Sequence, residues 1–198
     1  MSLALSLYLV DPELPRAVIG SGDVRVRRAI GGRFKGEMAQ DDEYFADEIE
    51  HGAPTRYEAL TAVVEGGPFD AKHGFQYGYA YQMICAFHGR RLWSNSFSPF
   101  KYAWLGYVDE ALKGLGITAV TVSELGYGLP SPLPHTDLPG HGVWTPEACA
   151  AALTQYEAVT EEQFAALDVE VREAVQDIGE WLQETRTHAG RGIVGFLA

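Results

Sequence analysis

Three potential metal ligands, His135, Asp137 and His141, lie within seven positions of one another in the segment PLPHTDLPGHG. Two imidazoles and a carboxylate are ligands that zinc or ferrous iron accepts, and irregular loops often carry such sites. Residues 126–142 contain four prolines and four glycines, so we expect an irregular loop. The favoured interpretation is a fixed loop whose polar side chains cap turns, and a metal site is the alternative.

A second group of candidates lies in and after the segment HGFQYGYAYQMICAFHG, where aromatic residues are unusually dense. The candidate binding residues are His73, Tyr77, Tyr81, His88 and Trp93. Aromatic side chains with polar tips can line a small-molecule pocket, but they also fill cores, and we favour the core. His73 and His88 stand about 22 Å apart on one helix and therefore cannot share an ion.

Cys85 lies three residues before His88, a spacing that places both on one face of a helix. A nucleophilic cysteine activated by a histidine base would need such a pair. The neighbouring Ile84 and Phe87 favour a buried, unreactive thiol instead. Cys149 is the only other cysteine, so no disulfide framework is predicted.

Motifs for other reactions fail on inspection. The sequence contains no G-x-S-x-G, H-E-x-x-H or G-K-[ST]. Gly20-Ser21-Gly22 begins like a dinucleotide-binding fingerprint, but Arg25 occupies the position of the third glycine. The sequence therefore assigns no reaction, predicts no cofactor, and leaves open whether the protein is an enzyme.

The elements that would position these residues indicate an α+β fold in a single domain, residues 1–198. Alternating apolar residues predict strands near 3–10, 117–124 and 192–198. About seven helices are expected around this small mixed sheet, because regular strand–helix–strand alternation is missing. Asp23 can cap a helix that runs through Ile30, after which closely spaced glycines at 31, 32 and 36 predict a loop.

Composition and charge limit the classes of partner. The 198 residues carry 15 basic and 27 acidic side chains, a formal charge of −12. Nucleic acids and anionic membranes need a basic footprint, so neither is expected as the main partner. The apolar N-terminus lacks a basic segment before it, so we expect no signal peptide, and no apolar stretch is long enough to span a membrane. We therefore predict a cytoplasmic protein.

The charge is unevenly distributed along the chain. Residues 16–35 carry six bases and one acid, a net charge of +5. Residues 147–188 carry ten acids and two bases, a net charge of −8. The long C-terminal helix predicted in this second segment should therefore present an acidic outer face.

Four segments together resemble an actinobacterial domain family of unknown function. They are DPELPRAVIGSGD after the first strand, the aromatic helix HGFQYGYAYQMICAFHG, DLPGHGVWTPEACAAAL, and the closing GRGIVGFL. That family is distantly similar to the YfbM-like uncharacterised proteins. The resemblance spans nearly the whole chain and implies a bacterial cytosolic α+β domain, but it implies no catalytic residue.

The leading functional prediction is a non-catalytic, acidic binding or interaction domain. Its acidic helix suits a basic protein partner through electrostatic complementarity, and one version is an antitoxin-like or immunity-like protein that masks a basic active site. The alternative is a small enzyme or ligand-binding protein that uses the aromatic middle section and the 135–141 loop. The sequence leaves the oligomeric state open.

Overall fold

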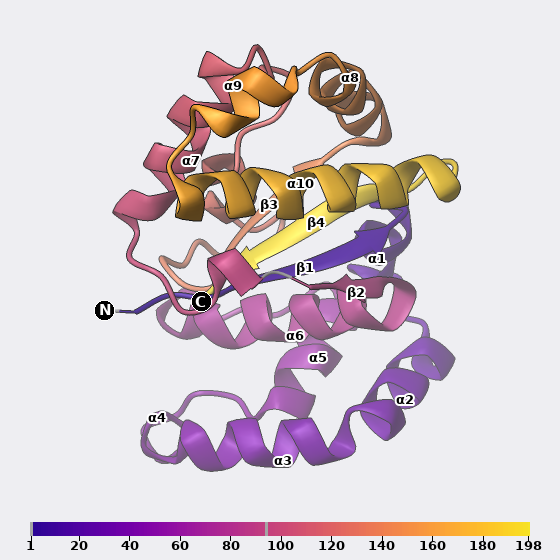
Figure 1. Ribbon diagram of the computed structural model, residues 1–198. Helices are drawn as coiled ribbons and strands as arrows, with labels where there is room; N and C mark the ends of the chain where they lie inside the picture. The colour runs from indigo at the N-terminus through magenta and orange to yellow at the C-terminus, as the bar shows by residue number, and fades with distance from the viewer. Residues whose placement is uncertain (1, 94) are drawn as a thin grey trace.

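The computed structural model describes residues 2–93 and 95–198 and contains one four-stranded antiparallel sheet. The strand order is β2-β1-β4-β3. The strands are β1 (Leu5–Val10), β2 (Arg90–Leu92), β3 (Gly140–Trp144) and β4 (Gly192–Leu197). The first and last strands of the chain pair at the centre of the sheet, and the two termini lie close together (Figure 1).

Two helical layers cover the two faces of this sheet (Figure 1). One layer contains α1 (Glu13–Val18), α2 (Val24–Arg33), α3 (Lys35–Tyr44), α4 (Ala46–Glu50), α5 (Arg56–Glu65) and α6 (Gly74–His88). The other contains α7 (Ala103–Gly114), α8 (Pro146–Glu157), α9 (Glu161–Ala165) and α10 (Val169–Thr187). The described residues also form three 3-10 helices: η1 (Ala71–His73), η2 (Asn95–Phe97) and η3 (Ser123–Gly126).

Strand periodicity divides the core into two parts. Along β1, Leu5, Leu7 and Leu9 pack with α7, α8 and α10, whereas Tyr8 and Val10 pack with α5 and α6. Successive side chains of a strand point to opposite faces, so both faces of a sheet covered by helices must be apolar. The α+β, single-domain prediction and the two terminal strands are confirmed.

The predicted strand at 117–124 is wrong. These residues run irregularly into η3, although Ile117, Val120 and Val122 are buried as a strand pattern requires. Side chains rather than a neighbouring strand satisfy the backbone: the carboxylate of Asp109 accepts from the N–H of Val122, and Gln155 accepts from two N–H groups of residues 118 and 119. Apolar alternation therefore reports burial here, not strand pairing.

Four further details differ from the sequence prediction. The sheet is wholly antiparallel rather than mixed, and residues 140–142, expected in a loop, begin strand β3. The described residues form ten α-helices instead of about seven. Asp23 caps α2 as expected, but the helix continues past Ile30. The predicted loop is therefore helical: Gly31 and Gly32 lie within α2, and Gly36 lies within α3.

Candidate functional site

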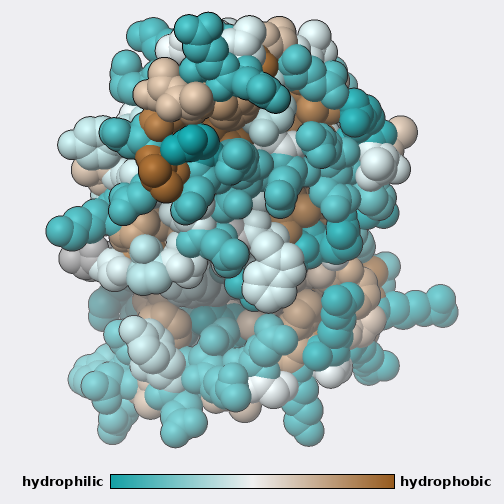
Figure 2. All heavy atoms as spheres, viewed as in Figure 1, coloured by the Kyte–Doolittle hydropathy of each residue, from teal (hydrophilic) through white to brown (hydrophobic). Residues whose placement is uncertain are grey.

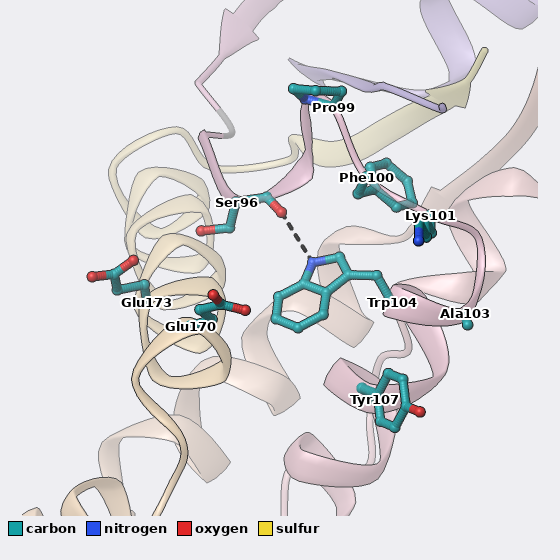
Figure 3. A pocket seen from close by; sticks show the side chains of 9 residues that line it. All are labelled: Ser96, Pro99, Phe100, Lys101, Ala103, Trp104, Tyr107, Glu170 and Glu173. Carbon is teal, nitrogen blue, oxygen red and sulfur yellow. Dashed lines mark hydrogen bonds between the residues drawn. The ribbon is translucent and has the colours of Figure 1, made fainter. Parts of the chain in front are cut away.

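The candidate site is a cleft of about 590 Å³ between α7, α10 and the segment that connects β2 to α7. Nine residues line it: Ser96, Pro99, Phe100, Lys101, Ala103, Trp104, Tyr107, Glu170 and Glu173. Figure 3 shows the indole ring of Trp104 between the two helices, with the two glutamates on the α10 side and Tyr107 on the α7 side. The volume falls in the range of small-molecule and side-chain binding sites.

Hydrogen bonds fix the segment above the cleft. The indole Nε1–H of Trp104 donates to the carbonyl oxygen of Ser96 at 2.9 Å. The backbone N–H of Ser96 donates to Oδ2 of Asp177 on α10 at 3.2 Å. The next residue, Phe97, is fully buried and its ring lies 5.4 Å from that of Trp181. The aromatic wall of the cleft is therefore held to α10 by both polar and apolar contacts.

Acidic residues follow one face of α10 from the cleft toward the C-terminal end of the helix. Glu170, Glu173, Asp177, Glu180 and Glu184 recur at intervals of three and four residues. This spacing places all five on one side of an α-helix, and we call this side the acidic face. Hydrophilic side chains cover most of the surface around α10 in Figure 2, with a small hydrophobic group near its N-terminal end.

Most of the acidic face forms no ion pair among the described residues. Glu184 pairs with Arg90 at its far end. Within residues 2–93 and 95–198, Glu170, Glu173 and Glu180 form no ion pair. Lys101 is the one cation among the described residues that line the cleft. The cleft therefore combines the faces of Trp104 and Tyr107 with two unpaired carboxylates, which is the chemistry that holds a guanidinium or ammonium group.

Among the described residues, none of the eight site residues predicted from the sequence lines this cleft. His73 is buried, and its Nδ1 lies 2.8 Å from the carboxylate of Asp70. The hydroxyl of Tyr77 accepts from the backbone N–H of Asp70 at 3.0 Å. These contacts fasten the chain that enters α6. Trp93 is 81% exposed, and its carbonyl oxygen accepts from the indole of Trp181.

Tyr81 and His88 have structural surroundings as well. Tyr81 and Cys85 are buried inside the α5–α6 core, and burial raises the pKa of both groups. A thiol with a raised pKa is protonated at neutral pH and is a poor nucleophile. His88 is the last residue of α6, where partial burial lowers its pKa.

The structure does not bring His135, Asp137 and His141 together as a ligand set. His141 lies on β3, where it is buried and its ring stands 5.4 Å from Tyr81 and 5.1 Å from Phe196. Among the described residues, no three histidine, cysteine, aspartate or glutamate side chains gather closely enough to hold a metal ion.

Within the described chain, no helix is long and apolar enough to cross a membrane.

His141 should make the stability of the protein depend on pH. Burial lowers its pKa from 6.5 to about 4, against a partly opposing hydrogen bond to the carbonyl of Gly128. The unfolded chain therefore binds more protons between these two values, and stability falls as the pH falls through this window. We expect a loss of about 2–3 kcal/mol between about pH 7 and about pH 4.5 from this residue.

Urea unfolding at both pH values measures this effect. The His141→Asn variant keeps an amide donor for the Gly128 carbonyl but does not titrate. Its unfolding free energy should therefore change less with pH than that of the wild type, by about the same 2–3 kcal/mol. Equal pH slopes for the two proteins would contradict the buried, neutral imidazole.

Comparison with known proteins gives one match. A family model described as a domain of unknown function, DUF7691, matches residues 1–198, the whole chain. No curated protein and no solved structure matches it.

Proposed function

We propose that this chain, which belongs to the DUF7691 family of domains of unknown function, is an acidic binding domain that holds a cationic side chain of a protein partner in the α7–α10 cleft. The observation that carries the proposal is the indole of Trp104 between the unpaired carboxylates of Glu170 and Glu173 on one side of the cleft and Tyr107 on the other. The bacterial, cytoplasmic setting implied by the sequence resemblance stays a prediction.

The energetics favour a partner with several positive charges over a single amine. A cation stacked on an aromatic face gains about 0.5–2 kcal/mol, and an exposed ion pair contributes about 0–1 kcal/mol. One side chain in the cleft would therefore bind in the millimolar range or weaker, since about 4 kcal/mol corresponds to 1 mM. Glu170 and Glu184 are separated by about 21 Å along the helix axis, so a longer partner can place further bases on the acidic face.

The cleft also supports a second candidate, a protein that binds a small organic cation. Its volume of about 590 Å³ is large enough for such a ligand. This candidate uses part of the aromatic middle section, Phe100, Trp104 and Tyr107, and not the 135–141 loop. Binding of argininamide as tightly as an arginine-rich peptide would favour the small ligand, because the peptide alone can reach the rest of the acidic face.

Calorimetric titration with a hexa-arginine peptide tests the proposed function. We expect binding that weakens steeply as salt rises, and a Tyr107→Ala variant should bind about 3–10-fold more weakly through the loss of one aromatic wall. Tyr107 is 67% exposed, so its truncation should leave the fold intact. Tyr127→Ala is the matched control, since Tyr127 is 75% exposed and does not line the cleft. No binding at low salt, or equal effects of the two variants, would refute the cleft as the site.

A further inference from the structure

We propose that one partner of the acidic face is a second copy of this chain, which docks through the exposed side of its α2 and the start of its α3. This inference rests on the proposed function, because it uses the same acidic face of α10. It adds the identity of the partner and a head-to-tail mode of association.

The first observation is an unpaired basic surface. Arg25 and Arg28 on α2 and Lys35 at the start of α3 are exposed. In the part of the chain that the structure describes, these three side chains form no ion pair, whereas Arg27 on the same helix pairs with Glu65. We call the surface of these three residues the basic face. Its charge is opposite in sign to that of the acidic face of α10.

The spacing of the two faces also agrees. The three bases are separated by three and seven residues. Read from the N-terminus of α10, Glu170, Glu173 and Glu180 are also separated by three and then seven residues. Read from its C-terminus, Glu180, Asp177 and Glu170 show the same two intervals. Arg25 and Arg28 lie on one helix, so they can lie along Glu170 and Glu173, or along Asp177 and Glu180, of a second copy, whereas Lys35 begins the next helix after the break at Phe34.

The second observation is a pair of exposed glycines in these helices: Gly32 lies between Arg28 and Lys35, and Gly36 follows Lys35. Gly31 is explained within one copy, since a Cβ atom there would lie 2.6 Å from the Tyr57 ring. Gly32 and Gly36 are exposed, and a Cβ atom at either position would meet nothing within 4 Å, so nothing within one copy requires them. Glycine inside a helix costs about 1 kcal/mol relative to alanine. A helix surface without side chains lets a second helix approach closely. Such a contact would explain why both residues, Gly32 and Gly36, are glycine.

The two faces cannot meet within one molecule. Figure 1 shows α10 on one side of the sheet and α2 on the other, beyond α5 and α6. Association between copies would therefore join different surfaces of the two partners, which continues as a chain or closes into a ring. The segments concerned carry net charges of +5 (residues 16–35) and −8 (residues 147–188), so we expect the association to weaken as salt screens them.

Sedimentation velocity of four proteins tests the proposal. The base-reversed variant is Arg25→Glu with Arg28→Glu, and the acid-reversed variant is Glu173→Arg with Glu180→Arg. Wild-type protein should associate at about 10 mM salt and dissociate at about 1 M, where the Debye length falls from about 30 Å to about 3 Å. Each reversed variant alone should stay monomeric, and an equimolar mixture of the two should associate again. A Lys72→Glu, Lys113→Glu variant reverses two exposed bases elsewhere and should behave as wild type.

A Gly32→Gln variant separates close helix contact from charge alone. It should raise the melting temperature, because glutamine is a better helix former, and it should weaken association about 10-fold by keeping the helices apart. Wild-type protein that stays monomeric at low salt, or a mixture of reversed variants that does not associate, overturns the inference. If such a monomer still binds hexa-arginine, the proposed function survives, and if it does not, both fail.

Discussion

Replacing Glu170 and Glu173 together by lysine should lower the affinity for an arginine-rich peptide by about 100-fold or more. Each reversal removes an attraction at the cleft and adds a repulsion of similar size, and about 1.4 kcal/mol per position corresponds to a tenfold change each. Both side chains are exposed and unpaired in the described chain, so the unfolding free energy should stay within about 0.5 kcal/mol of wild type.

Glu48→Lys with Glu50→Lys is the matched control for this charge reversal. These residues lie on α4 in the opposite helical layer, are exposed, and change the net charge by the same amount. Calorimetry at constant salt should show a small decrease in affinity for the control and a near-complete loss for the cleft variant. Equal losses would mean that the net charge of the protein, and not the cleft, attracts the peptide.

Gly142→Ala should destabilise the fold by about 4 kcal/mol or more, the largest stability effect we expect from a single methyl group. A Cβ atom at Gly142 would overlap the carbonyl oxygen of Glu124 and lie 2.6 Å from Cα of Leu125. Both contacts are with the backbone of η3, which cannot rotate away as a side chain could. The substitution must therefore separate η3 from β3 and open the core around Leu125.

Chemical unfolding measures this loss, and Gly32→Ala serves as the comparison. Gly32 lies in α2 with open space around it, so alanine there should stabilise the protein by about 0.5–1 kcal/mol. The two glycine-to-alanine changes should thus differ in sign. A Gly142→Ala protein as stable as wild type would contradict the close packing of η3 against β3.

Helices and strands were predicted correctly where their own residues show a hydrophobic or capping pattern. The alternation of Leu5, Leu7 and Leu9 and the closing apolar run gave the two central strands correctly. Thr160 and Gln163 have the spacing of a capping box, and in the structure they form one at the start of α9. The edge strands β2 and β3 were missed, because the first has three residues and the second lies in a glycine-rich segment that pairing with β4 makes extended.

The cleft could not be predicted, because its two walls are far apart in the sequence. Ser96 and Asp177 are separated by 81 positions, and their hydrogen bond is a consequence of the completed sheet. The sequence shows both the many aromatic residues of the middle section and the acidic helix. The residues near Trp104 or Glu170 in the sequence, however, do not indicate that these two side chains face each other. The 135–141 segment, in contrast, drew attention through composition alone, and tertiary packing buries His141 between Tyr81 and Phe196.

The most direct test of the cleft is a nitrogen-15 NMR titration with hexa-arginine that follows the indole N–H signals of the tryptophans. The Trp104 indole lies in the cleft and donates to Ser96, so its signal should shift progressively until saturation. The Trp144 indole donates to Thr121 in the core and should stay unchanged. A peptide that binds while the Trp104 signal stays fixed would contradict the account, because it would place the cation somewhere other than the α7–α10 cleft.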